Sequence, residues 1–103
     1  MQKYYYFRNV ENGHVTKKGL DGIIYLFEDE LDFQIFIQLS NVLNQSVYIY
    51  TVDAEAVDAS QLQSFKFNQA NRPATGTAFV LDGAVAKKHI KYVRHQSLRG
   101  MGK

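Results

Sequence analysis

Short blocks of apolar residues separated by polar stretches run along this chain, and the clearest block covers residues 47–52, VYIYTV. Its density of β-branched and aromatic side chains predicts a strand at the centre of a sheet. An earlier strand is predicted at residues 4–7, before a Glu-Asn-Gly turn signal. Another is predicted at residues 23–27, which form a continuous apolar run. Residues 14–22, between them, show little periodicity and are expected to form a loop.

Two further strands are predicted near the end of the chain, at residues 77–81 and 89–94. Asp82 and Gly83 lie between them and form a dipeptide typical of tight turns. The polar segment 68–76 holds the single proline and is expected to be the longest loop, while residues 57–62 have short helical potential.

One main helix is predicted over about residues 29–43. Three acids at positions 28–30 place negative charge where the exposed amides of a helix start can accept it. Leu31, Ile35 and Leu39 follow at helical spacing, and further apolar residues widen this stripe. A broad apolar stripe favours packing on the face of a sheet.

These elements predict an α+β fold in one small domain, with about five mostly antiparallel strands and the helix at about 29–43 packed on the sheet. The length of 103 residues, with 46% hydrophobic and 21% charged side chains, is ordinary for a single domain. We expect residues 1–95 to form this domain. Residues 96–103 end in a glycine-flanked segment and are expected to be a disordered basic tail.

Composition narrows the classes of function. The chain has no cysteine, which excludes disulfides, thiolate metal sites and a cysteine nucleophile, and which fits a reducing compartment. The segment MQKYYYFRN lacks the apolar core of a signal peptide, and no apolar run approaches the length of about 20 residues needed to span a bilayer. We therefore expect a cytoplasmic protein that does not use a membrane.

Three segments taken together resemble the ADP-ribosyltransferase-like superfamily. They are GIIYLFEDELDFQIFIQ, VYIYTVDAEAVDASQL and FVLDGAVAKKHIKYV, and the resemblance covers about residues 4–93 as patterns of apolar residues and turns. The superfamily includes NAD-dependent ADP-ribosyltransferases, several toxin domains and RNA 2′-phosphotransferases. The resemblance implies a strand leading into a helix, a further strand, and a closing strand–turn–strand unit, with NAD as a possible cofactor.

The resemblance also implies a set of binding residues. Arg8 stands where the first strand of the family ends in a group that holds cofactor or phosphate, and a guanidinium can clamp a phosphate with two hydrogen bonds. Tyr25 falls at the position that lines the nicotinamide pocket, although an aromatic in an apolar run is more often a core residue. His14 begins His-Val-Thr-Lys, a partial match to the H-x-T-S of the phosphotransferases.

The family position that matters most for transfer chemistry is not matched. The transferases place a glutamate at or just before the penultimate strand, whereas this chain has Gly-Thr-Ala-Phe at 76–79 and its nearest acid, Asp82, lies further on. Metal binding is not expected either, because His14, His89 and His95 show no helical pairing with a carboxylate between them. The common dinucleotide, P-loop and serine-hydrolase signatures are also missing.

Two hypotheses of function follow. The first is a small binding protein on this scaffold, acting on a protein or nucleic-acid partner as small proteins of phages and mobile elements often do. The second is a minimal NAD-dependent ADP-ribosyltransferase or RNA 2′-phosphotransferase-like enzyme. The unmatched glutamate favours the first hypothesis and Arg8 the second, so enzymatic activity is left open. The tyrosines at 4–6 with the basic tail could also form a stacking surface for nucleic acid.

Overall fold

The computed structural model describes residues 3–9, 15–40, 46–68 and 75–97. Six strands and one α-helix occupy these residues, with three short 3₁₀ turns between them. In chain order the elements are β1 (Lys3–Asn9), β2 (Gly19–Leu26), α1 (Glu30–Ser40), β3 (Ser46–Asp53), η2 (Ala54–Ala56), η3 (Ala59–Gln61), β4 (Leu62–Asn68), β5 (Thr75–Ala86), η4 (Lys87–His89) and β6 (Ile90–Ser97).

The strands form two three-stranded antiparallel sheets, one in the order β1-β3-β6 and the other in the order β2-β5-β4. The predicted central strand, β3, does lie between two partners. The sheets meet where Tyr5 of β1 pairs with Phe27, just past β2, through backbone N–H···O bonds of 2.7 and 3.0 Å. This short junction lets the two sheets diverge while they stay linked by hydrogen bonds.

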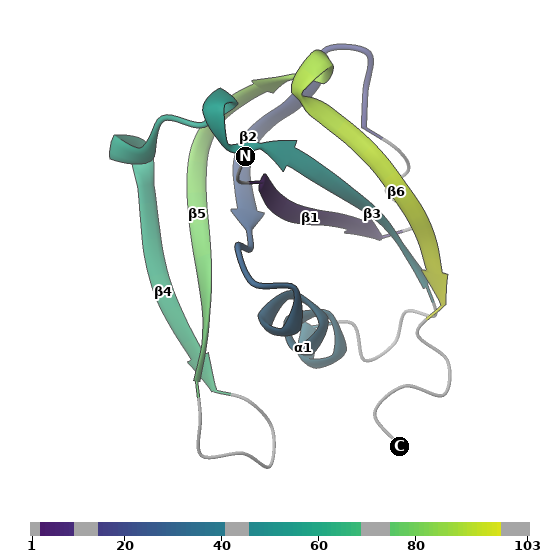
Figure 1. The fold of residues 1–103 in the computed structure, drawn as a ribbon, viewed down its shortest axis with the longest axis vertical. Coiled ribbons are helices and arrows are strands. Elements are labelled where there is room, and N and C mark those ends of the chain that lie inside the picture. The colour runs from purple at the N-terminus through teal and green to yellow at the C-terminus, as the bar shows by residue number, and fades with distance from the viewer. Residues whose placement is uncertain (1–2, 10–14, 41–45, 69–74, 98–103) are drawn as a thin grey trace.

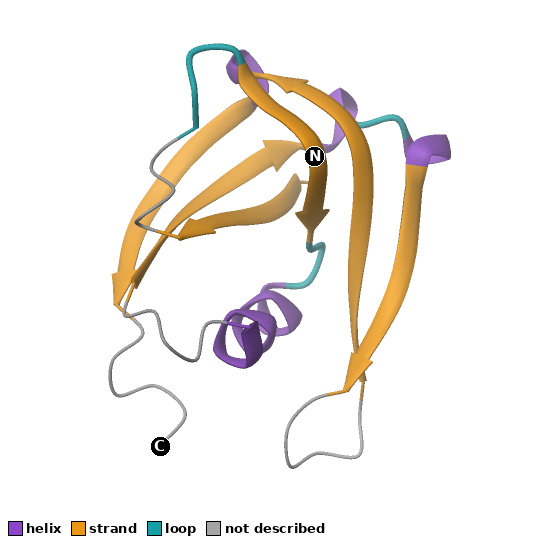
Figure 2. Cartoon of the chain, turned by 180° about the vertical axis from the view of Figure 1, so that it is seen from behind, coloured by secondary structure: helices purple, strands orange, loops and turns teal. Residues whose placement is uncertain are grey.

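The helix lies between the diverging ends of the two sheets. Figure 1 shows β4, β5 and β2 on one side, β1, β3 and β6 on the other, and α1 between them, and the reverse view agrees (Figure 2). The arrangement is the predicted α+β class, with six described strands in two sheets where five in one sheet were expected. No helix in the described ranges has the length and apolar character needed to cross a bilayer.

The hydrophobic core has two parts, because successive side chains of a strand point to opposite faces. Tyr5 and Phe7 of β1 pack toward α1, in a cluster with Phe27, Phe33 and other buried residues. Tyr4 and Tyr6 pack on the opposite side of β1, in a cluster to which both sheets contribute. The apolar residues buried in this second cluster are Leu20, Ile24, Leu26, Val52, Val57, Leu81 and Val85.

The helix begins one residue later than predicted, because Asp29 is its N-cap. The Asp29 Oδ1 atom accepts a hydrogen bond of 2.7 Å from the amide of Leu31, and the Asp29 carbonyl accepts the first helical bond, of 3.0 Å, from Phe33. The described helix ends at Ser40, and the predicted positions 41–43 fall outside the described residues.

Two strand predictions were wrong. The count of about five strands omitted β4, in which only Phe65 and Phe67 show an apolar alternation and the intervening side chains are polar. The tight turn predicted at Asp82 and Gly83 lies instead within β5, where these residues pair with Ile23 and Gly22 of β2. Pairing along the whole of β2 therefore outweighs the local turn preference of an Asp-Gly pair.

The remaining boundaries differ at strand ends. β2 begins at Gly19, inside the predicted loop, and β6 runs to Ser97, so two residues expected in the tail belong to a strand, while 98–103 fall outside the described residues. The register of β6 shifts beside Ile49, which pairs with Arg94, whereas the next residue, Tyr50, pairs with Tyr92. Val93 is therefore the extra residue of a β-bulge.

Candidate binding site on the tyrosine row

Four tyrosines form a row across the sheet β1-β3-β6, and we call them the tyrosine row: Tyr6, Tyr48, Tyr50 and Tyr92. Ring centroids lie 6.2 Å apart for Tyr6 and Tyr50, 5.6 Å apart for Tyr50 and Tyr92, and 6.3 Å apart for Tyr48 and Tyr92. Strand alternation places Tyr6 on the side of β1 opposite the helix-facing residues Tyr5 and Phe7.

The row runs from the interior to solvent. Tyr50 is only 3% exposed, whereas Tyr92 is 52% exposed. Packing against Tyr50 in a T-shaped arrangement restrains the Tyr92 ring, and its exposed part is available to a ligand.

A first hollow lies at the seam between the two sheets, and we call it the seam hollow. Its volume is about 390 Å³, which falls within the range of about 300–1,000 Å³ for small-molecule sites. Two charged residues, Arg8 and Asp21, and the aromatic Tyr6 are among the residues that line it. The lining residues within the described part of the chain are Tyr6, Arg8, Thr16, Gly19, Leu20, Asp21, Ile23 and Ile24.

A second, smaller hollow of about 240 Å³ adjoins the outer end of the tyrosine row. It is lined by Val15, Tyr50, Lys87, Ile90 and Tyr92. The amide of Val15 donates a hydrogen bond of 3.1 Å to the Tyr50 hydroxyl, which ties the segment before β2 to β3. The neighbouring Thr16 lines the seam hollow, so this segment separates the two hollows.

Burial raises the pKa of the Tyr6 and Tyr50 hydroxyls above the usual value of 10.0. The positive charge of Arg8 lowers the pKa of both hydroxyls by a smaller amount, which indicates that the guanidinium lies near both phenols. Both phenols therefore remain protonated at neutral pH and place no phenolate charge near Arg8.

A tight turn shapes the seam hollow. The amide of Gly19 donates a 3.1 Å hydrogen bond to the carbonyl of Thr16, and the Thr16 hydroxyl donates one of 2.8 Å to the carbonyl of Gly19. Gly19 has a φ of 107°, in the left-handed region that favours glycine. The turn thus sets the chain direction at the point where β2 begins to wall the hollow.

Of the three residues predicted to bind a cofactor, the two that the structure describes, Arg8 and Tyr25, lie in different places. Arg8 lines the seam hollow. Tyr25 instead packs on the helix side of the molecule, with ring centroids 6.4 Å from Phe36 and 6.0 Å from Phe65, and is 44% exposed. His14 lies outside the described residues, although its neighbours Val15 and Thr16 border the two hollows.

Transferases of the resembled family place a glutamate at the start of β5. In this protein the residues there make packing and hydrogen-bond contacts within the fold. A ring of Phe67 packs closely over Gly76. The amide of Thr77 donates a 3.0 Å hydrogen bond to the Asp32 carboxylate, so this carboxylate serves to tie α1 to β5. Asp82 is exposed further along β5.

Sequence reasoning missed most of the tyrosine row. It grouped the tyrosines at 4–6, which strand alternation separates, since Tyr5 faces the helix and Tyr6 joins the row. The available signal was the spacing of Tyr48 and Tyr50, two residues apart and therefore on one face of a predicted strand. The contribution of Tyr92 depends on the pairing of β6 with β3, which spacing alone does not give.

Possible metal ligands lie together at a different place. Asp53, Glu55 and His89 each bring one ligand atom into a group within 4.8 Å of one another. No metal site was predicted from the sequence because no histidines pair along a helix, whereas His89 lies in η4, far along the chain from Asp53 at the end of β3 and Glu55 in η2.

The chain matches no protein-family model, and no curated protein and no solved structure shows a significant similarity to it.

Proposed function

We propose that this protein is a small binding module that holds a nucleotide-containing ligand along the tyrosine row and the seam hollow. The observation that carries the proposal is the meeting of a row of four ring-packed tyrosines with Arg8 at a hollow of about 390 Å³. A cytoplasmic location, where nucleotides and RNA are abundant, belongs to the same proposal.

Each part of a ribonucleotide has a matching group at this place. Base faces stack on aromatic side chains, and such stacking contributes about 1–3 kcal/mol per base. The guanidinium of Arg8 suits a phosphate, with which it can form two parallel hydrogen bonds. The carboxylate of Asp21, in the wall of the same hollow, can accept hydrogen bonds from ribose hydroxyls. This combination favours a nucleotide over a purely apolar ligand.

The scaffold resemblance supports the same ligand class. This resemblance to the ADP-ribosyltransferase-like superfamily covers about residues 4–93 as patterns of apolar residues and turns, and proteins of that superfamily bind NAD or RNA. Since residues 75–79 carry no acid, the group that stabilises the cationic transition state in the transferases has no counterpart there. Binding without transfer is therefore our preferred function, and NAD-dependent transfer is the alternative.

The decisive experiment is a titration of the full chain with ADP-ribose, NAD and a short single-stranded RNA, followed by calorimetry and by NMR. We expect saturable binding of at least one probe. Arg8→Gln should weaken it about tenfold or more, because hydrogen bonds to charged groups contribute about 1.5–3 kcal/mol. Tyr92→Ala should weaken it about fivefold or more through loss of stacking.

Two matched variants serve as comparisons. Arg94→Gln removes an arginine of the same sheet that lies 3.9 Å from Glu30 of the helix, and it should leave binding unchanged. Tyr25→Ala removes an exposed tyrosine on the other side of the molecule. Binding that depends on Tyr25 and not on Tyr92 would place the ligand elsewhere, and absence of binding for all three probes at millimolar concentration would overturn the proposal.

A further inference from the structure

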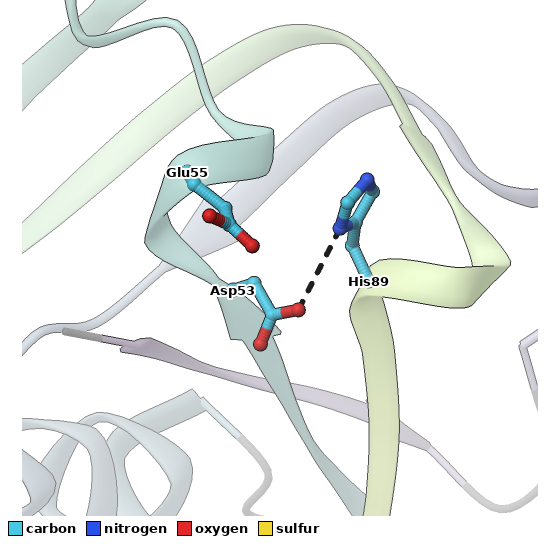
Figure 3. Close-up of side chains that lie close together, drawn as sticks. All are labelled: Asp53, Glu55 and His89. Atoms are coloured by element: carbon cyan, nitrogen blue, oxygen red, sulfur yellow. Dashed lines mark ion pairs between the residues drawn. The ribbon is translucent and has the colours of Figure 1, made fainter. Parts of the chain in front are cut away.

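Three side chains, one from the end of β3 and one from each of the turns η2 and η4, converge at one end of the sheet β1-β3-β6. Figure 3 shows Asp53, Glu55 and His89 pointing toward one another. The Nδ1 atom of His89 lies 3.6 Å from an Oδ2 atom of Asp53, and one ligand atom from each of the three residues falls within a 4.8 Å group. Asp53 and His89 are partly buried, and Glu55 is exposed.

The backbone explains the convergence. Val52 of β3 pairs with Ile90 of β6, so Asp53 and His89 are the next residues beyond the end of this ladder and face each other. The turn η2 follows Asp53 directly, and its closing bond of 3.1 Å from the amide of Val57 to the carbonyl of Ala54 brings Glu55 to the same side. The positions are thus set by strand pairing and by two short turns.

The spacing of Asp53 and His89 fits a shared metal ion as well as an ion pair with a protonated His89. A separation of 3.6 Å between nitrogen and oxygen is too long for a hydrogen bond. Two ligands that bind one tetrahedral zinc at about 2.0–2.2 Å each lie about 3.3–3.6 Å from one another. The Asp53–His89 separation therefore already has the value that a common metal ion would impose.

We propose that Asp53, Glu55 and His89 bind one divalent transition-metal ion. An imidazole nitrogen with two carboxylates is a ligand set that zinc accepts, and the nitrogen disfavours Mg²⁺ and Ca²⁺, which prefer oxygen ligands. Three protein ligands leave a coordination position for water or for an oxygen atom of a bound molecule. No ion is present in this structure.

Neighbouring positive charges would lower the affinity of this site for a cation. Lys87 and Lys88 belong to the same turn as His89, and both are exposed. Exposed ammonium groups can turn toward solvent, where their charge is screened. Binding also has a local consequence, because Lys87 lines the smaller hollow beside the tyrosine row. A metal ion joining η2 to η4 would hold the turn that carries this lysine.

The test is calorimetric titration of the full chain with Zn²⁺, with Mg²⁺ as a second probe, together with thermal unfolding at each metal concentration. We expect one Zn²⁺ per chain, a rise of the melting temperature with zinc, and much weaker binding of Mg²⁺. His89→Gln and Glu55→Gln should each weaken zinc binding about tenfold or more. His95→Gln, a change of the same kind at an exposed histidine of β6, should leave it unchanged.

Glu55→Gln keeps the test valid if His89→Gln fails to fold, since Glu55 is exposed in a short turn. NMR signals of the His89 ring should shift on zinc addition. Zinc binding that is unchanged in both ligand variants, or that depends on His89 and not on Glu55, would overturn the three-ligand site. Failure of the intact chain to bind zinc at millimolar concentration would overturn it as well.

Discussion

At the scale of single residues, Gly19 has a backbone conformation and close packing that disfavour any residue with a side chain. Its φ of 107° is left-handed, and a Cβ atom built on it would collide with the backbone carbonyl of Val85 and lie 2.8 Å from the amide nitrogen of Lys87. Gly22 has a similar φ of 95°, but a Cβ atom there would meet nothing within 4 Å. The two glycines separate the cost of the dihedral angle from the cost of close packing.

Gly19→Ala should reduce the free energy of unfolding by at least about 2 kcal/mol, because the unfavourable φ and the collision with β5 act together. Gly22→Ala should cost only about 1 kcal/mol, since it carries the φ penalty alone. Urea unfolding of the two variants measures the difference. Equal effects would show that the backbone of β5 yields to the added methyl group.

Tyrosine burial predicts a loss of stability at high pH. Desolvation raises the pKa of Tyr4, Tyr5, Tyr6 and Tyr50 above 10.0 in the folded protein. Above about pH 10 the unfolded chain has lost these protons while the folded chain keeps them, so the unfolded state binds fewer protons and stability falls as pH rises. Below that pH this contribution is fully present.

Urea unfolding at pH 8 and at about pH 11 measures this effect. The expected result is a lower free energy of unfolding at the higher pH, with a smaller decrease in Tyr50→Phe. Absorbance of tyrosinate should also show part of the tyrosines ionising above pH 10. A free energy of unfolding that rises over this interval contradicts the prediction.

At the scale of elements, the stability of α1 depends more on the hydrogen bonds of its N-cap residue, Asp29, than on negative charge near its start. Asp29 accepts amide hydrogen bonds from Leu31 at 2.7 Å and from Asp32 at 3.4 Å. Asp29→Ala should cost about 1 kcal/mol, the usual value for a lost N-cap. Glu28→Ala, a neighbouring exposed acid outside the helix, should cost less than half of that. Thermal unfolding of both variants checks the prediction, and similar losses would assign the effect to charge.

Elements whose own residues carry a strong pattern could be predicted from the sequence, and elements defined by their partners could not. β3 and α1 have dense apolar patterns and were placed within one or two residues where the structure describes them. β4 has two phenylalanines and little else, and it is a strand because β5 pairs with all seven of its residues. Pairing with β2 likewise keeps Asp82 and Gly83 of β5 extended.

At the scale of the whole molecule, Phe27 joins the two sheets and the helix. Its backbone pairs with Tyr5 across the junction, and its fully buried ring contacts Phe33 and Phe36 of α1 and Phe67 of β4. Phe27→Ala should cost about 3–5 kcal/mol, as expected for a large buried side chain. This loss is a large part of the about 5–15 kcal/mol by which a typical domain is stable.

Ile23→Ala provides the comparison for Phe27, since Ile23 is 67% exposed on the strand that precedes the junction and should change stability by less than about 0.5 kcal/mol. Circular dichroism and urea unfolding measure both variants. A Phe27→Ala protein that unfolds with the stability of Ile23→Ala would show that the junction is not central to the fold.

The candidate sites are properties of the whole fold, and this limits what the sequence could predict about them. Arg8 was identified through the family resemblance, as the residue at the end of the first strand that would hold a phosphate, and it does line a hollow. Asp21 and Tyr92, which belong to the same proposed binding site, come from strands of different sheets. Asp53 and His89 are likewise adjacent only because β3 and β6 pair, and spacing along the chain cannot show that pairing.

The bulge at Val93 also bears on whether β6 can pair with a strand of another copy of the protein. β6 has β3 as its only strand partner in the described part of the chain, so its other edge carries backbone groups suited to a second strand. The extra residue interrupts the regular spacing of those groups, and Lys91 and Arg94 place positive charge on both sides of it. Bulges and positive charges of this kind are the features by which exposed edge strands avoid pairing with other chains.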